Sequence, residues 1–275
     1  MSWVRRVADG LRTRSAGALL LELMVLVVGI LLALGVDGWL ERRREAAVAA
    51  QSLELVRNDL AQLVEQAREL EAYNRGVLEA VAVVWSATGA PGPIEKEPAT
   101  FDALSALSAR RTVRFPKAAY EELVATGNLR LLANPDLRAT LVRFYEELER
   151  DEEIILRNNE AYTDGLLNGL MVGEGLVVGV PTGRSDDRVE ALSPREEIRS
   201  AYIPVGVTWE GRLWGLPPGH PDRVRLRAAV AGLSSAAATH LILARRAREG
   251  ASALIDRIDQ VAEGGAAGKP MRAPR

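Results

Sequence analysis

The chain has 275 residues, a formal net charge of -2 at pH 7, no cysteine and only two histidines, His220 and His240. This length allows one or two domains with a buried core. The lack of cysteine excludes disulfides, thiol catalysis and Cys-ligated metal centres, and two histidines leave little material for a His-rich metal site. The near-neutral charge argues against a dedicated nucleic-acid binder, which usually carries a strong basic surplus.

The first strong feature is an apolar run at residues 16–36, which follows a short basic tail at 1–15 and contains Glu22 as its single charge. A helix of this length spans roughly 31 Å, enough to cross a hydrocarbon core of about 30 Å. The run is longer than the apolar core of a cleavable signal peptide. We therefore expect a transmembrane helix over residues 16–40, with cleavage or a buried core helix as the alternatives.

The residues that flank this run bear on its orientation. Trp39 is expected to anchor the helix at headgroup depth, where indole rings are enriched. Four arginines lie in the amino-terminal tail and three follow the run at 42–44, so the two sides are nearly matched. The short tail favours a cytoplasmic amino terminus and an exported carboxyl-terminal domain in a bacterial inner (cytoplasmic) membrane, with the lipid bilayer as the first partner.

A possible helix–helix contact lies along one face of the apolar run. At 100° per residue, Glu22, Gly29, Ala33 and Asp37 fall within an arc of about 80°. Gly29 and Ala33 form a small-xxx-small pair that permits close approach of a second helix, and Glu22 could hydrogen-bond across such a contact. This predicts a homo-oligomer. The alternatives are that Glu22 snorkels to the interface or serves an ion or proton role.

Two sets of positions match a known sequence pattern. The first is Glu22, the run 26–31, the pair 33–34, Trp39 and Glu41, and the second comprises 119–121, Leu123, Gly127, Leu129, Asn134, 137–138 and 144–145. In these positions the chain resembles a family of uncharacterised bacterial single-pass inner-membrane proteins. The sequence departs from the family pattern at Leu21, Gly35, Asp37, Gly38 and Leu40. The matches cover about a fifth of the chain, and the resemblance implies location and architecture but no activity.

A strict heptad follows the apolar run. Its a and d positions are Leu53, Val56, Leu60, Leu63, Ala67, Leu70, Asn74, Val77, Val81 and Val84. A polar residue at an a position, here Asn74, can set the register of a coiled coil. Two interpretations stay open: a helix packed inside its own bundle with Asn74 bonded locally, or a homo-oligomeric coiled coil with Asn74 as the register-setting residue.

Further helices are expected after a loop at 86–100. A short helix near 117–126 should stop at Gly127, a favourable residue just past a helix end. Pro135, preceded by Asn134, should begin a longer helix. Its expected apolar stripe is Leu137, Leu141, Phe144, Leu148, Ile155 and Tyr162. Six acids at 146–153 are expected to form a solvated helix face rather than a cation site.

The last third of the chain changes character at residues 172–220, which are rich in Gly and Pro. A helix start is expected at 193–194, and residues 202–209 are expected to be extended. Trp209 and Trp214 are expected to cover the end of the bundle. Pro221 should open a final helix to about residue 260. The predicted organisation is therefore a helical domain at 41–263 and a disordered tail at 264–275.

The predicted fold class is all-α: a transmembrane helix that runs into the long helix of an extramembrane antiparallel bundle, with an irregular Gly/Pro-rich insertion. No nucleophile–base pair, P-loop or metal motif is present in the sequence, so we expect no enzyme and no cofactor. Two functions remain: a membrane-anchored interaction or sensing module with an unknown protein partner, or a subunit of an oligomeric membrane assembly associated with a transporter or channel.

Overall fold

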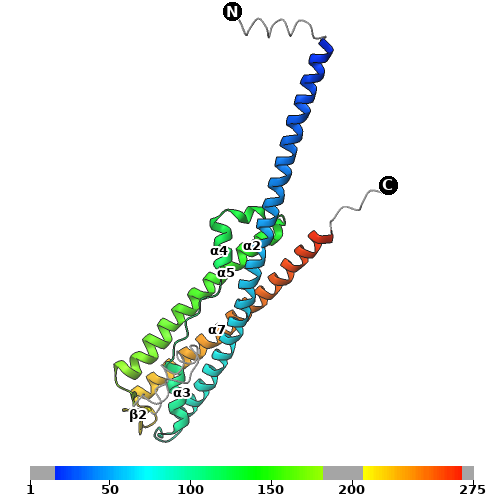
Figure 1. The fold of residues 1–275 in the computed structure, drawn as a ribbon. Helices are drawn as coiled ribbons and strands as arrows, with labels where there is room; N and C mark the ends of the chain where they lie inside the picture. The colour runs from blue at the N-terminus through cyan, green and yellow to red at the C-terminus, as the bar shows by residue number, and fades with distance from the viewer. Residues whose placement is uncertain (1–15, 182–206, 268–275) are drawn as a thin grey trace, which may run out of the picture. The chain divides into compact units, whose positions relative to one another are not determined.

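The structure is a computed structural model that describes residues 16–181 and 207–267 (Figure 1). The fold is all-α, as predicted, with one small two-stranded ribbon. In chain order the elements are α2 (Ala16–Gly89), α3 (Pro98–Ser108), α4 (Ala118–Ala125), the 3-10 helix η1 (Asn128–Leu131), α5 (Pro135–Asn158), the π-helix η2 (Asn159–Gly173), β1 (Val178–Pro181), β2 (Val207–Glu210) and α7 (Pro221–Ala267).

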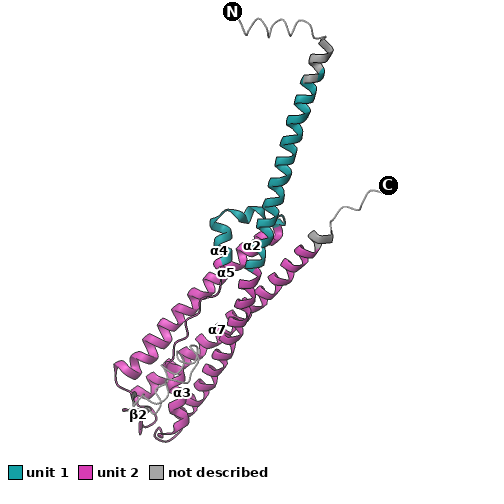
Figure 2. Cartoon of the chain, viewed as in Figure 1, with its two compact units in different colours: residues 1–56, 119–135 teal, residues 57–118, 136–275 magenta. Residues whose placement is uncertain are grey.

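The chain divides into two compact units, coloured separately in Figure 2. Unit 1 comprises Met1–Val56 and Ala119–Pro135, and unit 2 comprises Arg57–Ala118 and Asp136–Arg275. The boundary between the two units thus falls inside α2, after Val56. The sequence predicted that the transmembrane span ends earlier in this helix, at residue 40. Each unit therefore holds one part of α2.

Unit 1 contains the apolar amino-terminal part of α2. Every described side chain from residue 23 to residue 44 is exposed. The most apolar window of this helix has a mean hydropathy of 2.3, and none of it is buried. Elsewhere in unit 1, the buried side chains include Val56, Leu123 and Leu132.

A second helix, α7, is also long and apolar enough to cross a membrane, with a mean hydropathy of 1.4. Its window is 44% buried, because alanines and leucines on its inner face pack in unit 2. These buried residues include Ala229, Leu233, Ala237, Ala244 and Ala251. The alanine-rich face of α7 is therefore part of the packed core of unit 2.

The heptad seam of α2 belongs to the core of unit 2. Leu60, Leu63, Ala67, Leu70 and Val84 are fully or almost fully buried by the chain itself. A second copy cannot pack on side chains that are already covered. The bundle interpretation is therefore confirmed for this stretch, and nothing in the described residues supports a coiled coil of two copies along it.

The helix that begins at Pro135 is confirmed as α5, with Asp136 in its first turn. Its buried stripe contains the expected Leu137, Leu141, Leu148 and Ile155, but differs at Phe144, and also at Tyr162, which is only partly buried. Tyr145 is buried and Phe144 only partly so, and Phe144 instead lies against the backbone of α7 at Gly250. An aromatic ring at either position reaches the core, which is why the sequence pattern did not separate them.

Helix α5 passes into the π-helix η2, which the sequence pattern did not predict. In a π-helix the backbone bonds run from i to i+5, so each turn holds more residues than an α-helical turn. Four of the buried residues of η2 lie at steps of four, Asn159, Thr163, Leu167 and Met171, and Leu170 is buried beside Met171. The stripe therefore keeps facing the core through the change of helix type.

Two of the loop predictions are confirmed by backbone geometry. Gly127, which ends α4, has a φ of 72° in the left-handed region. Residues 207–210 are extended as β2, which pairs antiparallel with β1, with Val178 opposite Glu210 and Pro181 opposite Val207. Residues 202–206 of the predicted extended stretch lie outside the described residues. The predicted helix start at 193–194 lies outside the described residues.

The end of the bundle is closed by an apolar cap from the irregular region. Trp214 packs partly buried against the core of unit 2, and its ring meets Phe101 edge-on at 4.7 Å between centroids. The predicted covering role is confirmed for Trp214. For Trp209 the structure describes only the backbone, within β2.

The carboxyl-terminal boundary needs a correction. Helix α7 begins at Pro221 as predicted but continues to Ala267, so the predicted tail at 264–275 begins too early. Small residues such as Ala266 and Ala267 are compatible with a last helical turn. Residues 268–275 lie outside the described part of the chain.

Two glycines give a direct test of how closely the helices pack. A Cβ at Gly250 would lie 2.8 Å from Cε2 of Phe144, whereas a Cβ at Gly76 would meet nothing within 4 Å. We expect Gly76→Ala to raise the free energy of unfolding by about 0.5–1 kcal/mol through helix propensity. Gly250→Ala should lower it by about 1–2 kcal/mol through overpacking. Urea unfolding of both variants checks these two expectations. A higher free energy of unfolding for Gly250→Ala would show that Phe144 packs less tightly against Gly250 than the structure indicates.

Candidate functional site

The candidate contact residues of the apolar segment lie on a part of α2 that no other described segment of the chain covers. Gly29, Ala33 and Asp37 are exposed, and a Cβ at Gly29 would meet nothing within 4 Å. Glu22 lies in the same helix, and its side chain is outside the described part of the structure. The predicted helix–helix contact therefore remains a prediction about other chains, since no described part of this chain covers it.

Trp39 is also exposed, at the carboxyl end of the apolar segment. The guanidinium of Arg43 lies over its ring, 5.4 Å from the centroid. A cation over an indole face is attracted by the ring quadrupole. This arrangement brings an aromatic ring and a positive charge together where the apolar segment ends, as an interfacial anchor would require.

Asn74, the predicted register-setting residue, is buried inside unit 2. Its Nδ2 donates to the carbonyl oxygen of Leu70 one turn earlier, at 2.8 Å. A local bond of this kind satisfies the amide without a second copy of the chain. Asn74 instead lines a small polar cavity in the bundle.

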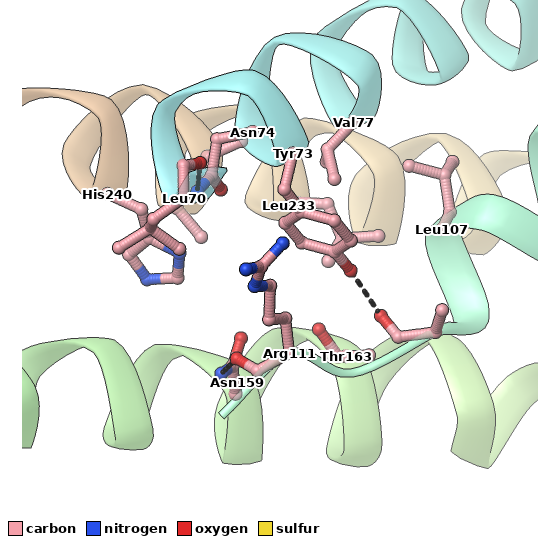
Figure 3. Close-up of a pocket in the computed structure, with 13 residues that line it drawn as sticks. Leu70, Tyr73, Asn74, Val77, Leu107, Arg111, Asn159, Thr163, Leu233 and His240 are labelled. Carbon is pink, nitrogen blue, oxygen red and sulfur yellow. Dashed lines mark hydrogen bonds between the residues drawn. The ribbon is translucent and has the colours of Figure 1, made fainter. Parts of the chain in front are cut away.

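This cavity lies between helices of unit 2 and is lined in part by polar side chains (Figure 3). Its volume is about 20 Å³, which is room for about one water molecule. Five segments contribute its walls: α2, α3 through Leu107, the linker after α3, η2 and α7. Its polar lining residues are Tyr73, Asn74, Arg111, Asn159, Thr163 and His240.

His240 is the central titratable group of the cavity and is only 6% exposed. Its Nε2 lies 3.3 Å from Nδ2 of Asn158. Burial lowers the pKa of His240 to about 4, because the charged imidazolium loses its hydration in the interior. The side chain is therefore neutral at pH 7, and its Nε2 can accept the amide hydrogen of Asn158.

Arg111 and Tyr73 form the outer wall of the cavity. The Tyr73 hydroxyl donates to the carbonyl oxygen of Ala109 at 2.9 Å, and burial raises the pKa of Tyr73 against the opposing charge of Arg111. Arg111 lies over the Tyr73 ring and pairs with Glu69 at 2.8 Å. Its carbonyl oxygen accepts a bond from Asn159. The linker is thus fastened to both α2 and η2.

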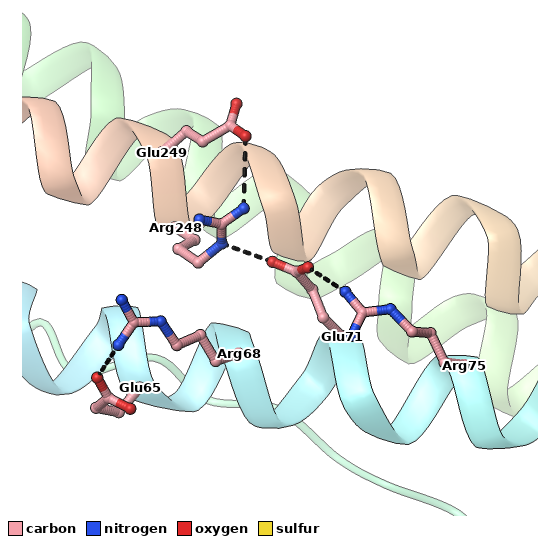
Figure 4. A network of polar contacts seen from close by, with 6 residues as sticks. All are labelled: Glu65, Arg68, Glu71, Arg75, Arg248 and Glu249. Carbon is pink, nitrogen blue, oxygen red and sulfur yellow. Dashed lines mark hydrogen bonds and ion pairs between the residues drawn. The ribbon is translucent and has the colours of Figure 1, made fainter.

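A carboxylate on α2 links this region to α7 (Figure 4). Glu71 is almost fully buried, accepts from Nε of Arg248 at 2.7 Å and pairs with Arg75 at 2.9 Å. By contrast, Glu65 and Arg68 pair on the exposed side of the same helix. Only the first set connects two helices of the bundle.

The acidic run at 146–153 is more than the solvated face that the sequence predicted. Asp151 is 3% exposed and forms an ion pair with Arg246 of α7. Glu152 accepts a bond from the backbone N–H of Phe115 at 2.6 Å. These two acids therefore join α5 to other segments, while neighbours such as Glu146 and Glu149 stay exposed.

Sequence reasoning also missed Arg223, which is buried near the end of α2. Its guanidinium donates to the carbonyl oxygens of Thr88 at 2.6 Å, Gly92 at 2.8 Å and Leu216 at 3.2 Å, and also to Ala90. A helix end leaves several carbonyls without helical partners, and a cation near that end is favoured by the helix dipole. A basic residue one turn into a helix is common, so the sequence held no signal for this role.

The described residues contain no group of three or more acidic or histidine side chains that could hold a metal ion. Sites for drug-sized ligands usually measure about 300–1,000 Å³, far more than the cavity beside His240. What this cavity offers chemically is one buried imidazole with amide and hydroxyl neighbours. Comparisons with family models, with curated proteins and with solved structures find no match to this chain.

Proposed function

We propose that the protein is a membrane-anchored helical module of the bacterial inner membrane that serves interaction or sensing rather than catalysis. The observation that carries this proposal is the uncovered apolar stretch of α2, in which every described side chain from 23 to 44 is exposed. Exposed leucines and valines in such number are costly in water, at roughly 25 cal/mol per Å² of apolar surface. A bilayer removes that cost.

A single pass is supported by the contrast between the two apolar helices. The span of α2 has the higher mean hydropathy, 2.3 against 1.4, and is uncovered, while α7 is partly buried in the bundle. Helix α7 also carries Arg246 and Arg248, which pair with Asp151 and Glu71 on other helices. Moving α7 into lipid would break both ion pairs.

The interaction or sensing role rests on architecture. In α2 the span and the bundle share one helix of 74 residues, so the membrane segment is covalently and helically continuous with the packed core. A bundle of this kind presents surfaces to a protein partner or responds to its surroundings. The partner chemistry does not include nucleic acid, because the net charge is -2, and no cofactor is required.

The orientation is tested by fusing a reporter that is active only outside the cytoplasm to the carboxyl terminus of the full chain. We expect this reporter to be active, because the short basic tail at 1–15 favours a cytoplasmic amino terminus. A matched fusion to a reporter active only in the cytoplasm should be silent. The reverse pattern would place the bundle in the cytoplasm and overturn the orientation.

The second candidate, an oligomeric membrane assembly, is favoured by the uncovered face that holds Gly29 and Ala33. We expect Glu22→Gln combined with Gly29→Leu to reduce the crosslinked oligomer in native membranes if that face is an interface. Leu32→Ala is the control, because Leu32 lies in the same helix but outside the arc that holds Gly29 and Ala33. An oligomer unchanged by the double substitution would exclude this interface.

A further inference from the structure

His240 occupies an unusual position in the core of unit 2. Its ring lies where α2, the linker after α3, η2 and α7 meet, among Leu70, Leu233 and Ala237. Figure 3 shows the ring on one side of the cavity, with Arg111 on the way to Tyr73 and Asn159 on the helix below. A change of charge on His240 would therefore be felt where several segments of unit 2 meet.

The neutral ring fits this setting. Nε2 can accept a hydrogen from Asn158 at 3.3 Å, and the remaining nitrogen is then protonated and can donate into the cavity. Protonation of Nε2 would place two donors opposite each other, and the Asn158 amide would have to rotate to present its oxygen. The interaction between α7 and the end of α5 is thus tied to the charge of His240.

No carboxylate lines the cavity to compensate a charged ring. From α2, Tyr73 faces the cavity, while Glu69 and Glu71 are engaged with Arg111 and Arg248. From the linker, the charged group is Arg111 itself, which has the same sign as an imidazolium.

The other two walls bring no counter-charge either. From η2 the lining residues are Asn159 and Thr163, which are uncharged, and Asp164 pairs with Arg110 outside the lining. From α7 the nearest charged residue along the helix, Arg245, is basic and exposed. A charge on His240 would therefore lose its hydration with no carboxylate in the cavity lining to compensate it, which is unfavourable.

We propose that His240 is a proton-operated switch, whose protonation loosens the packing of α7 on the α5–η2 helix. The inference rests on the proposed function in one respect, since it names the proton as the stimulus of the sensing module. The response itself belongs to the bundle and does not depend on which side of the membrane the bundle lies.

The direction and range of the effect follow from linkage. The folded pKa of His240, about 4, lies below the ordinary value of about 6.5, so the unfolded or opened state binds the proton more readily. Stability from this group is complete above pH 6.5 and is lost as the pH falls towards 4. Between pH 7 and pH 5 the equilibrium between closed and open bundle should shift by roughly 20-fold towards the open form.

The first measurement follows the imidazole C–H signals of the full chain in detergent micelles by NMR. A His220→Gln variant leaves His240 as the single histidine of the chain and so assigns its signal. The switch predicts an apparent pKa near 4 that is coupled to loss of α7 contacts. Titration near 6.5 without structural change would overturn the proposal, whatever the reporter fusions show.

The second measurement is hydrogen exchange, corrected for the intrinsic effect of pH, at pH 7 and pH 5. We expect amides of α7 near His240 and of η2 to lose protection by roughly 20-fold, while α3 changes less. His240→Gln, which keeps a polar side chain that cannot be protonated, should abolish the difference. A protection loss that is uniform over unit 2, or one that persists in His240→Gln, would contradict a local switch at this residue.

Discussion

Replacing Arg223 with methionine is expected to lower the free energy of unfolding by about 3–5 kcal/mol, the larger of the two main effects predicted for the bundle. The guanidinium is 2% exposed and donates to carbonyl oxygens at the end of α2 and in the loop that follows. Methionine fills similar space but leaves the carbonyls of Thr88, Ala90 and Gly92 without this donor. Each buried acceptor left unpaired costs about 1–3 kcal/mol, offset in part because the buried charge disappears as well.

Two comparisons make the Arg223 experiment specific. Arg245 lies on the same helix and is exposed, so Arg245→Met should change the urea midpoint little. Arg223→Lys keeps the charge but loses the planar, forked arrangement of donors. Its loss in free energy of unfolding should therefore lie between those of Arg223→Met and Arg245→Met. Equal stability of Arg223→Met and Arg245→Met would mean that the carbonyl cluster is satisfied without the guanidinium.

The second large effect concerns the ion pair between Asp151 and Arg246. Arg246→Met should lower the free energy of unfolding by roughly 2–3 kcal/mol, because Asp151 would stay buried without its partner. This is less than the cost for a wholly buried pair, since the Arg246 side chain is 54% exposed and partly screened by water. Thermal unfolding followed by circular dichroism at pH 7 gives the comparison with the wild-type chain.

The neutral variant Asp151→Asn should behave differently from Arg246→Met. Desolvation by burial raises the pKa of Asp151, and the hydrogen bond from Arg246 opposes this only in part. A raised pKa means that the folded state binds the proton more readily, so the contribution of this group falls as the pH rises through its folded pKa. Asparagine carries no charge and does not lose stability in this way. The free energy of unfolding of Asp151→Asn should therefore be close to that of the wild-type chain at pH 7. A larger loss for Asp151→Asn than for Arg246→Met would contradict this account of the pair.

Much of the fold could be predicted because its signals are local in the sequence. The Asn-Pro start of α5, Gly127 and Pro221 each mark a boundary by a property of one or a few residues. The heptad of α2 similarly predicts which face is buried. What the heptad leaves undecided is the partner of that face, since its own bundle and a second copy present the same chemistry.

The candidate site was harder to predict because its contacts join residues that are far apart in the chain. Asp151 and Arg246 are separated by 95 positions, and Asn158 and His240 by 82. Within an acidic helix, nothing in the sequence distinguishes the buried Asp151 from its exposed neighbours. The π-helix η2 was missed for a related reason: its steps of four between buried residues also fit an α-helical stripe.

Anchoring in the membrane is the central claim, and alkaline carbonate extraction of cell membranes tests it most directly. The full chain should stay in the membrane pellet, because an anchor would bury the exposed apolar part of α2 in lipid. A variant with Val27→Arg and Leu31→Arg, at about 2.5–3.5 kcal/mol for each central charge, should shift to the soluble fraction. A wild-type chain released by carbonate like a peripheral protein would contradict the anchor.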